Sequence, residues 1–395
     1  MLTIVNSCGT LAVMDFRDSP ADAEFRAEAR RVIEAAVAAL PGPEPTTTED
    51  RLPYFRQFQR AIRDAGYAGL SWPQEYGGRD ASLTEQAIFL QEYDRAGAPD
   101  RLNLLGEGLA GPTIIDFGSE EHKQRFLPGI LSGEEIWCQL FSEPNAGSDL
   151  AALEARAQRD GDEWRISGQK VWTSRAQVAS YGLLLARTGG GPRHKGITYF
   201  LLPMDAEGVS IRPLRHMLGE AEFNEVFLDD VRVPDDLRIG EVDGGWRVAM
   251  ATLSYERVAL ATGRVNVQRL VGELVSMVRE RPTDTALRRQ VADLYARSQV
   301  QRINGLRALS SLEKGTPGPE ASIGKLLSAP LVEELADLAC SLAGLDAQLD
   351  EDGELDPWLR LAYQARGTSI AGGTTFIQRN IVAERVLGLP RATKP

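Results

Sequence analysis

A polar turn directly after a buried strand is the first stretch of this chain that could do chemistry. The apolar run from Ile136 to Phe141 is followed at once by Ser142, Glu143 and the segment Pro144 to Ser148. A continuous apolar run is typical of a strand buried on both faces, and the turn after it offers backbone N–H groups and hydroxyls to a polar ligand. A sandwich strand that ends in an ordinary turn has the same pattern, so spacing alone leaves both readings open.

A carboxylate in apolar surroundings is the second candidate for chemistry. Glu256 is followed by the cation Arg257 in a stretch with helical spacing. The apolar residues around this pair are Met250, Leu253, Val258, Leu260 and Ala261. Burial would raise the pKa of the Glu256 carboxylate toward the range of a general base, and the arginine could orient it. A surface glutamate on an amphipathic helix fits the same residues.

The hydrophobic period changes twice along the chain. Residues 15–131 show spacings of three and four, which predict helices, and the pattern from Gly245 onward is helical again. Between them, short runs rich in aromatic and branched residues predict strands separated by turns. Two helical blocks around a β unit predict an α+β chain rather than a doubly wound sheet. The expected units are an N-terminal helical domain (1–135), a middle β-domain (136–240) and a C-terminal helical domain (241–395).

Composition limits the possible partners. The 395 residues include 44 Lys and Arg against 56 Asp and Glu, a net charge of -12, which argues against nucleic acid or an anionic membrane as partner. No apolar run has the length of a membrane span. Three cysteines without metal-like spacing favour neither a disulfide framework nor a metal site, and we expect a cytoplasmic protein. Met1 to Val13 lacks the features of a signal peptide and is expected to be a disordered extension or a misplaced start.

Three signatures in order resemble those of the acyl-CoA dehydrogenase family. Trp137 to Asp149 reads W-C-Q-L-F-S-E-P-N-A-G-S-D, close to the flavin wall of that family, C-x-T-E-P-x-A-G-S-D. Lys170 to Ser174 reads K-V-W-T-S, and Ile370 to Arg379 reads I-A-G-G-T-T-F-I-Q-R. The resemblance implies the fold of the family, in which the C-terminal domain is a four-helix bundle.

The resemblance also implies an activity. Members of the family use FAD to introduce a 2,3-double bond into an acyl-CoA thioester: a carboxylate takes the α-proton, flavin N5 accepts the β-hydride, and an electron-transfer flavoprotein receives the electrons. Many members carry this base in I-Y-E-G-T, but Gly372 stands at the matching position here. A second subset carries it in x-x-E-R-x-x-x-A, which Glu256 and Arg257 match. The resemblance therefore makes Glu256 the expected base, with Arg257 beside it.

The binding residues follow from the same motifs. The resemblance implies flavin contacts along one edge and near N5, contacts to the diphosphate, and no metal. The residues expected to bind FAD are Gln139, Phe141, Ser142, Gly147, Ser148, Trp172, Ser174, Thr374 and Phe376. The residues expected to bind the substrate are Ser148, Ser254 and Arg257.

Several departures from the family pattern leave the assembly open. The segment Val275 to Arg289 lacks the R-x-x-F-G string that usually reaches a neighbour's FAD, and Phe376 replaces a common Glu or Gln. The chain could form the usual homotetramer, with Arg288, Arg289 or Arg297 substituting from a shifted position, or an α2β2 heterotetramer with a related subunit. The alternatives to a dehydrogenase are a flavin monooxygenase or oxidase on the same fold and a partner subunit that completes another chain's active site. The identity of the acyl group is not encoded in any motif found.

Overall fold

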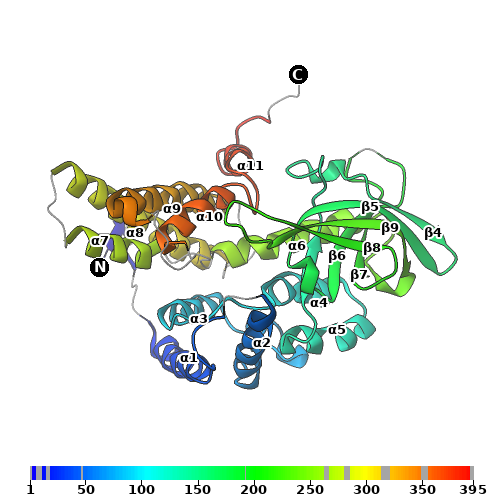
Figure 1. Ribbon diagram of the computed structural model, residues 1–395, viewed down its shortest axis with the longest axis horizontal. Helices are drawn as coiled ribbons and strands as arrows, with labels where there is room; N and C mark the ends of the chain where they lie inside the picture. The colour runs from blue at the N-terminus through cyan, green and yellow to red at the C-terminus, as the bar shows by residue number, and fades with distance from the viewer. Residues whose placement is uncertain are drawn as a thin grey trace.

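The computed structural model describes nine segments of the chain, which form three parts. The described residues are 2–5, 11–14, 18–45, 48–191, 193–261, 267–279, 285–312, 321–347 and 355–391, with the backbone alone at 2–5, 11–14, 48–50, 256–261, 306, 308–312 and 321. Figure 1 shows the β unit at one end of the molecule, the C-terminal helices at the other, and the N-terminal helices below both. The expected α+β class, with helices before and after a β unit, is confirmed.

The N-terminal part consists of helices and short helical turns. Their bounds are α1 Pro20–Ala38, α2 Thr48–Asp64, η1 Gln74–Tyr76, α3 Leu83–Arg95, the π-helical turn η2 Gly106–Ala110, α4 Gly111–Phe117 and α5 Glu120–Ser132. Ser19, Ser82 and Ser119 each accept a hydrogen bond from the third residue of the helix that follows, which fixes where α1, α3 and α5 begin.

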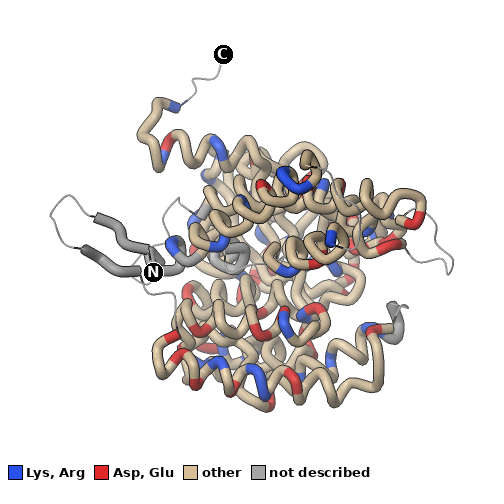
Figure 2. The backbone as a smooth tube through the Cα atoms, turned by 90° about the vertical axis from the view of Figure 1, so that its left-hand side faces the viewer, with Lys and Arg blue, Asp and Glu red and all other residues tan. Residues whose placement is uncertain are grey.

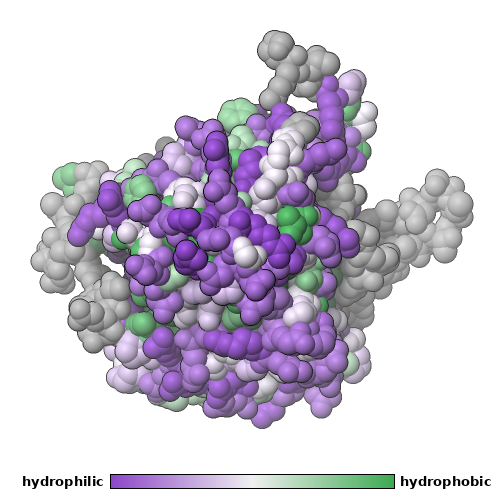
Figure 3. Space-filling model, turned by 90° about the vertical axis from the view of Figure 1, so that its right-hand side faces the viewer, coloured by the Kyte–Doolittle hydropathy of each residue, from purple (hydrophilic) through white to green (hydrophobic). Residues whose placement is uncertain are grey.

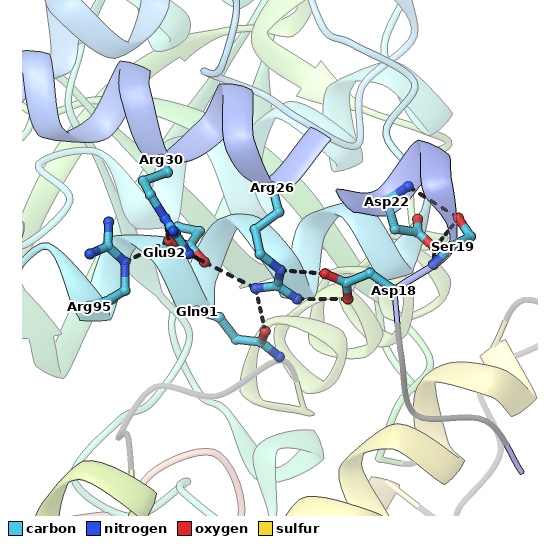
Figure 4. Close-up of polar contacts among 8 residues, drawn as sticks. All are labelled: Asp18, Ser19, Asp22, Arg26, Arg30, Gln91, Glu92 and Arg95. Atoms are coloured by element: carbon cyan, nitrogen blue, oxygen red, sulfur yellow. Dashed lines mark hydrogen bonds and ion pairs between the residues drawn. The ribbon is translucent and has the colours of Figure 1, made fainter. Parts of the chain in front are cut away.

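A buried acid joins α1 to α3. Glu92 is 3% exposed and receives hydrogen bonds from Arg30 (2.9 Å), Arg95 (2.7 Å) and Arg26 (3.1 Å), with Asp18 completing the network on Arg26 (Figure 4). Burial alone would raise the pKa of Glu92, but these three hydrogen bonds outweigh it and lower the pKa to about 2. The carboxylate is therefore charged at neutral pH and anchors the two helices.

The middle part is an eight-stranded sheet with the order β10-β7-β6-β4-β5-β9-β8, in which β3 also pairs with β6. The strands are β3 Trp137–Leu140, β4 Arg156–Asp160, β5 Glu163–Ser174, β6 Tyr181–Arg187, β7 Ile197–Pro203, β8 Val209–Leu214, β9 Phe223–Pro234 and β10 Arg238–Ile239. Three short 3-10 turns connect them: η3 Leu150–Ala152, η4 Ala176–Val178 and η5 Asp235–Leu237.

The central strands of the sheet serve two hydrophobic cores at once. Leu183 and Leu185 of β6 belong to the core shared with the N-terminal helices, whereas Leu184 and Ala186 belong to the core on the other side of the sheet. Successive side chains of a strand point to opposite faces, so a run without polar residues has both faces covered.

The C-terminal part is helical. Its elements are α6 Gly245–Ala261, α7 Val267–Arg279, α8 Thr285–Leu312, α9 Ala321–Ala343, η6 Gly344–Ala347, α10 Pro357–Thr368, α11 Thr375–Ile381 and the π-helical turn η7 Val382–Val386. Helices α7 to α10 share one core. Hydrophobic spacing predicts a helix from Gly245 to about Glu280; α6 and α7 are helical parts of this stretch, and residues 262–266 between them lie outside the described residues.

The start of the chain contains a hairpin, which contradicts the first of its two expected interpretations, a disordered extension. Instead of an extension without structure, β1 (Leu2–Val5) pairs antiparallel with β2 (Leu11–Met14). Within the described parts of the chain, no helix combines the length and the apolar character that a bilayer span requires.

The two ends of the molecule are rich in polar residues. Figure 2 shows acidic and basic residues interspersed along the helices at the C-terminal-domain end. Figure 3 shows a mostly hydrophilic surface at the end of the β unit, with apolar residues scattered over it. The view of Figure 3 shows no continuous apolar face.

Candidate active site

The polar turn after β3 is held against β5 by a main-chain hydrogen bond. Val171 N donates to Ser142 O at 2.9 Å, and Glu143 and Ala146 close the turn with two backbone hydrogen bonds of 3.0 Å. Phe141 is buried, Ser142 is half-buried, and the segment Gly147 to Ser148 is exposed beyond the turn. The first two of the three sequence signatures therefore meet in space, although Ser142 and Val171 are 29 positions apart along the chain.

A buried ion pair fixes the same two signatures together. Lys170 Nζ lies 2.8 Å from Glu143 Oε1 and 3.3 Å from Phe141 O, and the two side chains are 0% and 7% exposed. The Glu143 carboxylate also accepts hydrogen bonds from Glu154 N (2.6 Å) and Ala155 N (3.0 Å). Burial lowers the pKa of Lys170 despite the opposing effect of Glu143. Sequence reasoning missed this pair, although both residues lie inside the quoted motifs.

Trp172 projects from an irregularity in β5. The pairing of β5 with β9 shifts register between Lys170 and Thr173, and Trp172 there has a φ of +60°. Its side chain is 62% exposed and meets Phe223 edge-to-face, with ring centroids 6.0 Å apart. A bulge re-aims a side chain relative to its strand, so this large aromatic ring points out of the sheet. Ser174, at the end of β5, is half-buried beside it.

Helix α6 carries the expected base and is fixed by polar contacts in its middle. Thr252 is fully buried, with its Oγ1 2.8 Å from Thr113 Oγ1 of α4 and 3.2 Å from the Tyr199 hydroxyl of β7. One turn further on, the Tyr255 hydroxyl donates to Asp116 of α4. Positions 256 and 257 continue this helix, and the side chains of Glu256 and Arg257 lie outside the described residues.

Ser254 is the remaining predicted substrate contact on α6. Its hydroxyl donates to Ala251 O within the helix at 2.7 Å. In this arrangement the oxygen can accept a hydrogen bond from a ligand.

The third signature forms a glycine turn between α10 and α11. Gly372 and Gly373 have φ of +64° and +88°, a conformation that glycine adopts without strain. The turn is held by Lys325 of α9, which donates to Thr368 O (2.5 Å) and Ala371 O (2.6 Å), and by Gln378, which donates to Gly372 O (2.9 Å).

The residues flanking this turn differ in what they offer a ligand. Thr374 caps α11 by accepting from Ile377 N at 3.3 Å, which leaves its O–H free to donate. Phe376 is 74% exposed, so an apolar ring stands at the surface where a polar side chain is common in the family.

One of the arginines considered as substitutes is already engaged. Arg297 Nη2 lies 2.6 Å from Glu334 of α9, and Arg297 Nε lies 3.3 Å from Asp293. The contacts therefore stabilise the helical bundle. Residues 280–284 of the segment in which the R-x-x-F-G string was sought lie outside the described residues.

Comparison with known proteins identifies the family. The chain matches the family models of the acyl-CoA dehydrogenase N-terminal domain over residues 19–134, middle domain over 138–231 and C-terminal domain over 243–387. The chain belongs to the acyl-CoA dehydrogenase family, and it is an FAD-dependent oxidoreductase that acts on CH–CH groups.

Individual relatives cover almost the whole chain. The acyl-CoA dehydrogenase IpdE1 of Mycobacterium tuberculosis is 42% identical over 94% of this chain and 98% of that protein, and the IpdE1 of Mycolicibacterium smegmatis is 41% identical with the same coverage. Among solved structures, the Tcur3481-Tcur3483 steroid ACAD has 31% identity and a TM-score of 0.84 over 96% of this chain and 100% of that chain. The ChsE4-ChsE5 complex from Mycobacterium tuberculosis has 30% identity and a TM-score of 0.83 with the same coverage.

The residues present fit an FAD. Gln139 Nε2, on β3, is buried without a hydrogen-bond partner among the described residues, so it is free to donate to a ligand. Trp172 supplies an exposed aromatic face, and the turn after β3 supplies main-chain and hydroxyl groups for a planar polar ring. Bound FAD supplies the acceptor for the hydride.

Proposed function

We propose that this chain converts an acyl-CoA thioester to the 2,3-enoyl-CoA and that Glu256 is the base. The Glu256 carboxylate would take the α-proton, and the electron pair of the broken α C–H bond would become the new double bond. FAD, when bound, would supply the acceptor for the β-hydrogen as hydride. The observation that carries the proposal is the glycine at 372. Gly372 has no side chain, so the position that carries the base in many family members has no carboxylate here. Helix α6 carries Glu256 instead and packs against β7, η2 and α9.

The remaining site residues are proposed in the roles that the family motifs give them. Arg257 orients the base. Gln139, Phe141, Ser142, Trp172 and Ser174 line the flavin ring, and Gly147, Ser148 and Thr374 face its diphosphate. Phe376 borders the same cofactor with an apolar surface, and Ser148 and Ser254 contact the thioester substrate.

The substrate class is proposed as a bulky acyl-CoA, such as one with a steroid-derived acyl group. Two observations support it: the neighbour with a TM-score of 0.84 is a steroid ACAD, and Gly372 removes a side chain from the turn. We also propose an electron-transfer flavoprotein as electron acceptor and the cytoplasm as location, which suits the free thiols of Cys138 and Cys340.

Assembly with a related subunit is the proposed quaternary state. The solved neighbours named Tcur3481-Tcur3483 and ChsE4-ChsE5 are complexes of two different chains. This chain lacks the R-x-x-F-G string, and Arg297 is used inside the bundle. A homotetramer is the competing state, and native mass measurement of the FAD-saturated protein, alone and co-expressed with a related subunit, distinguishes the two.

The test of the reaction is anaerobic titration of the FAD-loaded protein with a panel of acyl-CoAs. Loss of the flavin absorbance on mixing, with enoyl-CoA formed in equal amount, is the expected result. Consumption of oxygen in place of anaerobic bleaching would favour the oxidase or monooxygenase. Protein that binds no flavin, alone or with a partner, would favour the structural subunit.

A further inference from the structure

Arg175 follows β5 directly and has a backbone conformation that arginine rarely adopts. Its φ is +58°, in the left-handed region that favours glycine and asparagine. Its N–H donates to Glu222 O at 2.9 Å, and η4 begins immediately after it. A bulky residue kept in this conformation points to a role for its side chain, because glycine would hold the same turn without strain.

The side chain of Arg175 crosses to the N-terminal helical part. Its Nη1 donates to Leu102 O at 2.8 Å and to Arg101 O at 3.1 Å, and its Nη2 lies 3.9 Å from the Asp100 carboxylate. One guanidinium therefore ties the end of β5, two residues beyond Thr173, to the segment between α3 and η2. A charged donor to two carbonyls is stronger than a neutral pair, so the contact resists rotation of the strand end.

The same segment also holds β3. Asn103 is 1% exposed, and its Oδ1 accepts from Trp137 N at 3.1 Å while its Nδ2 donates to Ile130 O and Glu135 O. Residues 101 to 103 are thus hydrogen-bonded both to the start of β3 and, through Arg175, to the end of β5. Asn103 secures the first strand and Arg175 the second.

We propose that Arg175 is a positioning residue for the flavin site: it fixes the end of β5, and with it Trp172 and Ser174, relative to the strand that carries Gln139 and Ser142. The inference rests on the proposed function, because it assigns the geometry of that flavin site to a residue whose guanidinium contacts main-chain carbonyls of the N-terminal part.

The test compares three substitutions with a matched surface control. Arg175→Asn and Arg175→Gly suit the backbone conformation but remove the guanidinium. Arg175→Lys keeps the positive charge but replaces the planar guanidinium by one ammonium group. The control, Arg63→Asn, makes the arginine-to-asparagine change at an exposed position of α2. The readouts are the dissociation constant of FAD from fluorescence titration, the melting temperature of the apoprotein, and kcat and KM for an acyl-CoA that the unaltered protein oxidises.

A selective effect on the flavin site is the expected result. Arg175→Asn and Arg175→Gly should raise the FAD dissociation constant about tenfold, as for loss of one charged hydrogen bond. They should lower kcat about 10- to 100-fold with little change in KM, since a small misplacement of the reacting groups is enough. Arg175→Lys should recover part of both losses, and Arg63→Asn should change neither.

Two outcomes would overturn the inference. Asparagine and glycine variants that bind FAD and turn over like the unaltered protein would show that the contacts of the Arg175 side chain have no role in positioning the flavin site. A fall in melting temperature that accounts for the FAD loss, with no recovery in the lysine variant, would mark Arg175 as a stability residue only. Failure of the unaltered protein to oxidise any acyl-CoA would instead count against the proposed function, and the FAD dissociation constants would still test Arg175.

Discussion

Lys170 and Glu143 form an ion pair of 2.8 Å in which neither side chain is more than 7% exposed. The acid belongs to the turn after β3 and the lysine to β5, so the pair is shared between the two strands of the flavin wall. Breaking such a pair leaves one charge buried and unpaired.

Lys170→Met should therefore destabilise the protein by about 3–5 kcal/mol, as expected for removal of one partner from a buried pair. Chemical unfolding of the apoprotein measures this change. The matched control is Asp64→Asn in the exposed pair with Arg63, where a change within about 1 kcal/mol is expected. The double variant Glu143→Gln with Lys170→Met should recover part of the loss, because no charge is then stranded. Equal effects for Lys170→Met and Asp64→Asn would contradict the structural role of the pair.

Glu256→Gln should lower the rate of flavin reduction by an acyl-CoA about 10²- to 10⁴-fold, the contribution of a general base. FAD binding should persist, because the substitution keeps the shape of the side chain. Stopped-flow absorbance under anaerobic conditions provides the rate. The control, Glu273→Gln, removes an exposed acid paired with Arg269 on α7 and should leave the rate unchanged. A fully active Glu256→Gln enzyme would eliminate this residue as base.

Acid should weaken the junction of α1 and α3 through Glu92. The pKa of this carboxylate is lowered from 4.5 to about 2 in the fold, so its stabilising contribution is fully present above about pH 4.5 and is lost as the pH falls toward 2. Urea unfolding of the unaltered protein and of Glu92→Gln, followed from pH 6 downward, tests this dependence. The difference in unfolding free energy should be constant above about pH 5 and shrink below it. A difference that stays constant down to about pH 3 would contradict the lowered pKa.

Trp172→Ala should separate cofactor binding from folding. The ring is 62% exposed, so the free energy of unfolding of the apoprotein should change by less than about 1 kcal/mol, while FAD binding weakens about tenfold. Trp72 is the contrast: it is 1% exposed and its Nε1 donates to Glu107 O at 2.9 Å. Trp72→Ala should cost about 3–5 kcal/mol of stability. Calorimetry measures the stability of each variant, and flavin fluorescence measures its FAD binding. Similar losses of stability for Trp172→Ala and Trp72→Ala would contradict the assignment of Trp172 to the FAD site.

The fold was predictable because hydrophobic spacing reports on which faces are covered. The all-apolar run of β6 and the helical spacing around Phe25 and Ala29 predict a buried strand and an amphipathic helix, and both form. The ends of elements were less predictable. The exact starts of helices depend on local caps such as those of Ser19, Ser82 and Ser119, which hydrophobic spacing does not report.

The site was predictable only as far as its motifs were contiguous. Trp172 and Ser142 were found within recognisable strings, but their proximity depends on the hydrogen bond between Val171 and Ser142. Arg175 was missed because its partners are main-chain carbonyls 73 and 74 residues earlier, which carry no side-chain signature. The charged residues around His122 in the sequence indicate a solvated helix face, yet its ring contacts Asp236 O of η5 and caps α5, which helps attach the N-terminal helices to the β unit.

The alternation of Leu183 and Leu184 between two cores has a practical consequence for dissecting this protein. A shortened chain that began at β3 would lack the N-terminal helices that cover one side of β6 and β7. The apolar side chains on that side of the sheet would then be exposed to solvent. Such a fragment should self-associate when expressed alone. The N-terminal helices, the sheet and α6 thus share one hydrophobic core, so the domain bounds given by the family models cut through it.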